Sequence, residues 1–187
     1  LTDALKGDAK AQGDWGEMQL ETLLNYAGLQ NEVHYSKQDS HKTENGRLQT
    51  DFLIKLPGNK SIILDAKVSL TAYERYYHAQ STNEQQLALK EHVRSVKTHI
   101  DTLGSKEYQR IESIKSPDYV IMFVPLEAAF HVALQAQPEL FEQAMKKNVV
   151  LVSTSTLLAT LRTINFLWSQ ENQQKNAKEI AKQAGLL

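Results

Sequence analysis

Residues 49–68 read QTDFLIKLPGNKSIILDAKV, and this stretch carries most of the information about the fold. Apolar residues alternate with other residues along 49–56 and again along 61–68, which is the period-two pattern of a half-buried β-strand. Between the two runs, the sequence PGN at 57–59 is a strong turn signal. The stretch therefore predicts a β-hairpin whose strands belong to a central sheet.

The second strand of this hairpin carries a carboxylate and an ammonium group on one face. Asp65 and Lys67 are two residues apart, so in a strand they project the same way, about 6.5 Å from each other. A carboxylate is a hard oxygen ligand that suits magnesium, and a neighbouring lysine can orient water or neutralise charge on a phosphate. Taken alone, the pair is also what an ordinary ion pair on a sheet face looks like.

The loop length of the hairpin determines which residue faces Asp65. A three-residue loop pairs Leu56 with Lys60 and brings Asp51 opposite Asp65. A four-residue loop would instead place Asp51 opposite Ala66, with the two carboxylates on opposite faces. The glycine and asparagine of the turn suit the left-handed backbone that three-residue loops need. We therefore expect an odd loop or a bulge here, and paired aspartates.

Glu17 is a third candidate acid. It shares a helical stripe with Leu20 and Leu24, so its side chain can point at the sheet. It also stands three residues after Asp14, where it completes a capping box at the predicted helix start, and this explanation is at least as good. The two strand acids are harder to explain, because unpaired buried charge is costly and calls for a cation partner.

The remaining elements follow from hydrophobic periodicity and cap residues. In chain order we expect a helix at 14–28, a strand at 33–37, a polar loop at 38–47, helices within 70–103 that break at a capping box at Ser81, a strand at 119–125, two short helices with the second opened by Pro138, a strand at 148–152 and a helix at 154–184. This order predicts one α/β domain over 14–187, with a mixed central sheet and helices on both sides. Residues 1–13 are polar and lack a complete apolar face, so they are interpreted as the tail of a preceding helix or as a linker.

Composition limits the function classes. The chain has no cysteine, which excludes a disulfide framework and thiolate zinc sites. No run approaches the ~18 apolar residues of a membrane span. The formal net charge is -1, so contacts to nucleic acid must come from local clusters. The candidates are Lys42, Arg47, Arg94, Lys97, Lys106 and Arg162, although such side chains are often only solvated.

A set of short motifs extends along the chain from Gly13 onward. They are GDWGE at 13–17, DF at 51–52 through LP at 56–57, DAKV at 65–68, LTAYE at 70–74, residues 92–106 with Tyr108, MFVP at 122–125, and LLATLRT at 157–163 with Trp168. Taken together, these motifs resemble the RmuC family of DNA recombination proteins. Two positions depart from the family pattern, since Thr50 and Thr154 stand where prolines are usual. Neither departure removes a predicted metal ligand.

The resemblance implies a PD-(D/E)xK, restriction-endonuclease-like fold and a metal-dependent deoxyribonuclease site. Asp51 would match the first acid, Asp65 the second, Lys67 the lysine and Glu17 the helix acid, with the carbonyl of Ala66 as a further metal ligand. The implied cofactor is Mg²⁺ or Mn²⁺, and the implied reaction is phosphodiester hydrolysis in DNA.

The resemblance also implies a conserved C-terminal domain of a longer cytoplasmic protein, tethered to the inner membrane only through an upstream segment. It implies that residues 1–13 are the end of an upstream helical or coiled-coil segment. DNA is the expected partner, and a homo-oligomer through helices is a further expectation. Two alternatives remain open at this point. One is a catalytically silent DNA-binding module of the same fold. The other is a structural domain that self-associates through the apolar seam within 89–103 and the last helix.

Overall fold

The structure is a computed structural model that describes residues 9–37, 40–43, 46–49, 51–66, 69–106 and 119–185. Its elements are α2 (Ala9–Tyr26), β1 (Tyr35–Lys37), β2 (Ser40–Thr43), β3 (Gly46–Gln49), β4 (Phe52–Leu56), β5 (Lys60–Asp65), α3 (Thr71–His78), α4 (Thr82–Ser105), β6 (Val120–Val124), α5 (Glu127–Ala136), α6 (Glu139–Met145), β7 (Val149–Ser153) and α7 (Thr154–Gln183).

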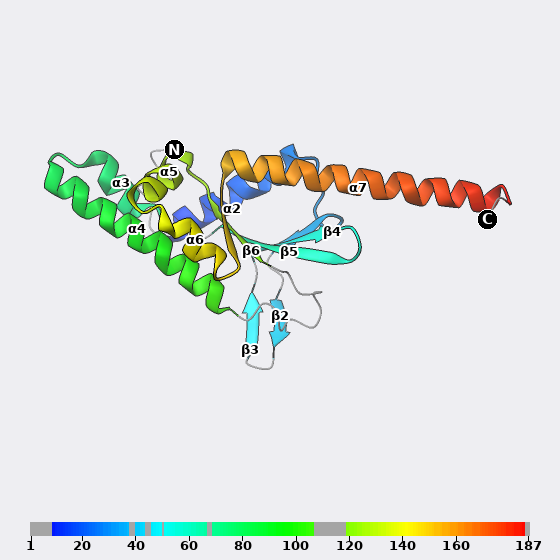
Figure 1. The fold of residues 1–187 in the computed structure, drawn as a ribbon, viewed down its shortest axis with the longest axis horizontal. Coiled ribbons are helices and arrows are strands. Elements are labelled where there is room, and N and C mark those ends of the chain that lie inside the picture. The colour runs from blue at the N-terminus through cyan, green and yellow to red at the C-terminus, as the bar shows by residue number, and fades with distance from the viewer. Residues whose placement is uncertain are drawn as a thin grey trace.

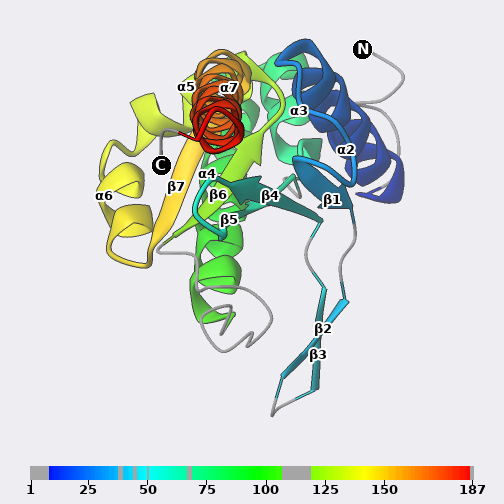
Figure 2. The same cartoon turned by 90° about the vertical axis from the view of Figure 1, so that its right-hand side faces the viewer.

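The central sheet is mixed and lies between two layers of helices (Figure 1; Figure 2). Its strand order is β1-β4-β5-β6-β7, in which β1, β4 and β5 pair antiparallel while β5, β6 and β7 pair parallel. The parallel connections run through α3 and α4 and then through α5 and α6, as parallel neighbours require. The predicted α/β class with a mixed sheet is confirmed.

Each face of the sheet has its own hydrophobic core. One core lies between the sheet and the four helices α3, α4, α5 and α6, and it includes strand residues such as Leu53, Ile63 and Met122. The other joins α2 and α7 with the alternate residues of the same strands, such as Ile54 and Leu64. This division follows from the period of two along a strand, which sends successive side chains to opposite faces.

The register of the β4–β5 hairpin confirms the predicted three-residue loop. Leu56 pairs with Lys60, and the ladder runs from there to Phe52 opposite Leu64. Two turn residues take the left-handed backbone that the loop needs, Gly58 with φ 76° and Asn59 with φ 62°. Continuing the ladder by one residue places the next two positions, both aspartates, opposite each other.

The start of the first helix was predicted wrongly. Helix α2 already includes Ala9 and runs through Asp14, so Asp14 and Glu17 do not form a capping box at its start. Tertiary contacts explain the longer helix, because the side chain of Gln12 is buried and its Oε1 accepts a 2.9 Å hydrogen bond from the Leu70 N–H. The predicted end is confirmed, with Gly28 at φ 83° just beyond the helix.

The predicted loop at 38–47 and the predicted strand at 49–56 both need correction. The region contains a separate two-stranded ribbon of β2 and β3, in which Ser40 pairs with Gln49 (Figure 2). The strand expected from residue 49 is therefore divided, and β4 begins only at Phe52. The sequences of β2 and β3, SHKT and GRLQ, have no alternation of apolar residues, so hydrophobic periodicity does not reveal this ribbon.

The break between α3 and α4 and the capping box at Ser81 are confirmed. The Glu84 N–H donates to Ser81 Oγ at 3.3 Å, and Glu84 Oε2 accepts from the N–H of Gln80 at 3.1 Å. The apolar seam on α4 is largely used inside the domain, since Val96 and Ile100 are buried in the core beneath the sheet. These buried positions are not available for self-association.

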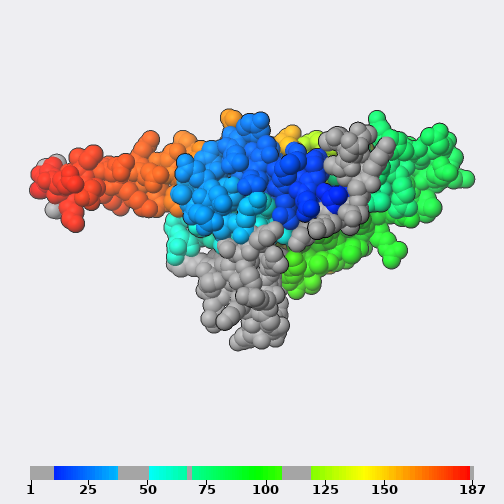
Figure 3. All heavy atoms as spheres, turned by 180° about the vertical axis from the view of Figure 1, so that it is seen from behind, coloured from blue at the N-terminus to red at the C-terminus, as the bar shows by residue number. Residues whose placement is uncertain are grey.

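The last helix combines a buried anchor with a projecting arm. The first turns of α7 are packed in the core, and Trp168 donates from Nε1 to the carbonyl oxygen of Lys55 at 3.0 Å. The C-terminal part of the helix extends past the rest of the molecule (Figure 1; Figure 3). Over the described residues, no helix is both long and apolar enough to cross a membrane.

Candidate acidic site at the end of the central strands

The two predicted strand acids lie at the edge of the sheet where the parallel strands have their carboxyl ends. Asp65 is the last residue of β5 and pairs with Met122 on β6, two residues before β6 ends at Val124. In open α/β sheets, ligands bind in the region outside the carboxyl ends of the strands. The hairpin register brings Asp51 to the same place.

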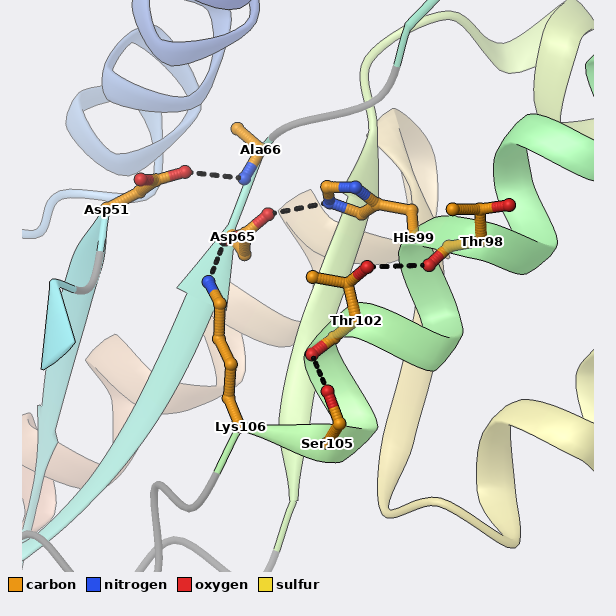
Figure 4. A network of polar contacts seen from close by, with 8 residues as sticks. All are labelled: Asp51, Asp65, Ala66, Thr98, His99, Thr102, Ser105 and Lys106. Carbon is orange, nitrogen blue, oxygen red and sulfur yellow. Dashed lines mark hydrogen bonds and ion pairs between the residues drawn. The ribbon is translucent and has the colours of Figure 1, made fainter. Parts of the chain in front are cut away.

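Asp51 is bound to the backbone of the neighbouring strand. Its side chain is buried, and Oδ2 accepts a 3.3 Å hydrogen bond from the N–H of Ala66 (Figure 4). This contact extends the pairing of β4 and β5 beyond the last backbone pair. The hydrogen bond holds the Asp51 carboxylate beside the end of β5. In the register of the hairpin, Asp51 is then the residue opposite Asp65.

Asp65 contacts two basic side chains, one on α4 and one directly after its last residue. It is only 2% exposed, with His99 Nε2 at 2.9 Å from Oδ2 and Lys106 Nζ at 3.9 Å from Oδ1 (Figure 4). An ionised carboxylate can only accept, so the His99 Nε2–H is the donor. His99 lies within α4, whereas Lys106 is the residue directly after Ser105 and has extended backbone, so the end of the helix sets the direction of its side chain. The carboxylate is thus buried but compensated on both oxygens.

The end of α4 beside Asp65 is held by its own hydroxyl groups. Thr102 Oγ1 donates to the carbonyl of Thr98 at 2.9 Å, and Ser105 Oγ donates to the carbonyl of Thr102 at 2.8 Å (Figure 4). The N–H of Lys106 donates to Leu103 O at 3.2 Å as the helix terminates. These bonds satisfy carbonyls near the helix end and define where the Lys106 side chain starts.

His99 is the site residue that sequence reasoning missed. In the sequence His92 and His99 are seven residues apart and do not form a metal-ligand pattern, so packing is the default interpretation of both. That interpretation suits His92, which is fully buried and whose Nε2 lies 2.8 Å from the carbonyl of Ala129. A polar residue at position 99, beside the buried stripe of α4, was the available signal, but its partner lies 34 residues away along the chain.

Helix α2 reaches the same edge through a glycine. A Cβ at Gly16 would lie 3.0 Å from the carbonyl oxygen of Ala66, so only glycine lets the helix come this close without a shift. Glu17 follows directly and is half-buried. Glu17 does not join Asp51 and Asp65 in a cluster, since the described residues contain no group of three or more His, Cys, Asp or Glu side chains that could hold a metal.

The predicted basic residues are divided by the structure. Lys106 reaches Asp65, while Arg94 and Lys97 are exposed on the opposite side of α4 from His99. Arg162 is exposed on α7. The remaining three predictions, namely Lys67 and the side chains of Lys42 and Arg47, lie outside the described residues.

A second polar cluster joins the ends of β6 and β7. Glu127 accepts from Ser153 Oγ at 2.7 Å and from the N–H of Ser155 at 3.2 Å. These bonds, above all the one from Ser153, lower the pKa of the Glu127 carboxyl. Where the usual proline is replaced, Thr154 Oγ1 donates to the carbonyl of Pro125 at 3.1 Å. The cluster caps the start of α7 and links it to the end of β6.

Fold and site together define the class of protein: an α/β domain whose mixed sheet carries two buried aspartates at the end of adjacent central strands. The chain belongs to the RmuC family, whose sequence profile matches residues 1–187.

Similar proteins carry the same family name. The whole chain aligns at 52% identity with 41% of the DNA recombination protein RmuC homolog of Pseudomonas aeruginosa. It aligns at 47% and 46% identity with 40% of each DNA recombination protein RmuC from Salmonella typhimurium and Escherichia coli. The chain therefore spans about two fifths of the length of these relatives.

Proposed function

We propose that this domain hydrolyses phosphodiester bonds in DNA with the help of a divalent metal ion, as part of a protein that acts in DNA recombination. The observation that carries the proposal is the pair of buried aspartates, Asp51 and Asp65, side by side at the carboxyl-end edge of the sheet. DNA is proposed as the substrate because the similar proteins are named for DNA recombination.

The donor set at this edge suits magnesium or manganese. Mg²⁺ is usually bound by one or two carboxylates together with waters and substrate phosphates, so a three-carboxylate cluster is not needed. Asp51, Asp65 and the carbonyl oxygen of Ala66 are all hard oxygen donors, and they would hold the ion. When bound, such an ion supplies an activated water and stabilises charge on the phosphate.

The surrounding residues have distinct roles in this proposal. The Ala66 N–H orients the carboxylate of Asp51, and the His99 Nε2–H orients that of Asp65. Hydrogen bonds of this kind to ligand carboxylates are a normal feature of metal sites. Lys106 adds positive charge at a distance of 3.9 Å from Asp65. Lys67 is proposed, from its place in the motif, to position the water or the phosphate.

The experiment is a cleavage assay on labelled linear, single-stranded and branched DNA with Mg²⁺, Mn²⁺ or chelator. The test variants are Asp51→Asn, Asp65→Asn and Lys67→Ala. Asp101→Asn is the matched control, because Asp101 is an exposed carboxylate on α4 that pairs with Lys147. Metal-dependent cleavage that the three test variants lose and the control keeps is the expected result. Absence of cleavage by the unmodified domain with every metal would refute hydrolysis.

A catalytically silent DNA-binding module is the second candidate. Two observations favour it: both oxygens of Asp65 already face basic side chains, and no three-membered acidic or histidine cluster forms among the described residues. In that case Asp65 would serve as a structural anchor for α4. DNA binding by the unmodified domain, unchanged in Lys67→Ala and without cleavage, would select this candidate.

A further inference from the structure

A hollow of about 480 Å³ lies between α4 and the C-terminal end of α5, and it has no role in the acidic site. Its α4 side is formed around Leu89 and Val93, and its α5 side ends at Ala136. His99 faces roughly the opposite way on the same helix, because each residue of a helix advances by about 100°. The hollow is therefore a separate surface feature, and its occupant need not be the substrate.

Three cations line the α4 side of the hollow. Lys90, Arg94 and Lys97 line it at a spacing of four and then three residues, which places them on one stripe of α4. The lining contains no carboxylate. Across the described ranges, none of the three has a carboxylate partner, in contrast to Arg75, which pairs with Glu91 at 2.6 Å. The stripe thus presents uncompensated positive charge.

The interior of the hollow is apolar rather than charged. Leu89 and Val93 are only half-buried, and Val93 packs on the core beneath the sheet. Ala136 is the exposed last residue of α5. The volume is within the range of about 300–1,000 Å³ that is typical of ligand pockets. A phosphate backbone alone would need the cations but would gain nothing from this apolar pocket.

We propose that this hollow binds an acidic peptide segment of a partner protein, with a bulky apolar side chain of the peptide in the pocket. The carboxylates of the peptide would pair with Lys90, Arg94 and Lys97 around it. Gln86 and Gln137 also line the hollow, and their amides can both donate to and accept from a peptide backbone. An apolar anchor surrounded by charged contacts is the usual arrangement of a peptide-binding groove.

The test measures fluorescence anisotropy of the full chain with a labelled synthetic peptide of aspartates and glutamates that carries two leucines four residues apart. A second peptide has serines in place of the leucines. The charge variant is Arg94→Glu and the pocket variant is Ala136→Trp, which fills the hollow from an exposed position without changing charge. Lys178→Glu, on the projecting part of α7, is the matched charge control.

Binding of the leucine peptide is expected to weaken roughly tenfold in Arg94→Glu, since a hydrogen bond to a charged group is lost and a repulsion is added. A similar loss is expected in Ala136→Trp and with the serine peptide, while Lys178→Glu binds normally. Equal binding of both peptides, or no effect of Ala136→Trp, would overturn the proposal. Duplex DNA could also displace the leucine peptide from the parent chain and from Ala136→Trp, but not from Arg94→Glu. That result would mean that the stripe binds phosphates instead. Concentration-dependent dimerisation abolished by Arg94→Glu would identify a second copy of the chain as the occupant.

Discussion

Two glycines of α2 provide a sharp test of how this helix contacts the acidic site. Both Gly13 and Gly16 lie inside Ala9–Tyr26, where alanine is favoured over glycine by up to about 1 kcal/mol. A Cβ at Gly13 meets no atom within 4 Å, so Gly13→Ala should raise the free energy of unfolding by roughly that amount. In a chain of this size, 1 kcal/mol corresponds to a shift of about 2–4 °C in Tm.

Gly16→Ala gains the same helix propensity as Gly13→Ala, but the new Cβ meets a different environment. Its Cβ would lie 3.0 Å from the carbonyl oxygen of Ala66 and 3.8 Å from Cγ of Pro125. Relieving the closer contact requires movement of the end of β5 or of the helix, and overpacking of this kind typically costs about 1–3 kcal/mol. We therefore expect Gly16→Ala to be less stable than Gly13→Ala by about 2 kcal/mol.

Urea unfolding of the parent and both single variants, monitored by circular dichroism, measures these differences directly. The unfolded-state effect of replacing glycine by alanine is common to both variants, so it cancels in their comparison. If Gly16→Ala proves as stable as Gly13→Ala, the argument that α2 sits against the Ala66 carbonyl is refuted. That result would also contradict the placement of α2 beside the edge of the sheet that carries Asp51 and Asp65.

Three further predictions concern the body of the domain. Burial lowers the pKa of His92 below its usual 6.5, despite the opposing hydrogen bond that its ring donates to the carbonyl oxygen of Ala129, so the fold favours the neutral ring. The stability that neutral His92 contributes is complete above pH 6.5, the pKa of the unfolded chain. It is lost as the pH falls below 6.5, because in that range the unfolded chain takes up a proton on this histidine and the folded chain does not. Unfolding at pH 7.5 and 5.5 should show a smaller pH effect in His92→Gln, and an equal effect would contradict the assignment. Gly28→Ala should cost about 1–2 kcal/mol in urea unfolding, because φ is 83° and a Cβ would lie 2.9 Å from Nδ2 of Asn165; a neutral result would rule out this conformation. Trp168→Phe removes the indole hydrogen bond and should lower the free energy of unfolding by about 1 kcal/mol. Proteases should then cut the part of α7 that follows residue 168 faster, and an unchanged rate of cleavage would mean that Trp168 does not secure this part of the helix.

The hairpin and its paired acids follow from the sequence alone. Strand period and turn chemistry are local properties, and the three-residue loop at Gly58 and Asn59 sets the register over the whole hairpin. Once the register is set, the positions of Asp51 and Asp65 on adjacent strands are determined. The near-continuous apolar run of β6 is local in the same sense, and so is the capping box that separates α3 from α4.

Only the tertiary structure decided which groups surround those acids. His99 reaches Asp65 from 34 residues away, because α4 packs its apolar stripe on the sheet and thereby turns one edge toward the end of β5. The early start of α2 depends on a bond from Gln12 to Leu70, 58 residues apart. No local pattern encodes such contacts, since they depend on how whole elements pack, and packing selects one arrangement from many that the same local sequence allows.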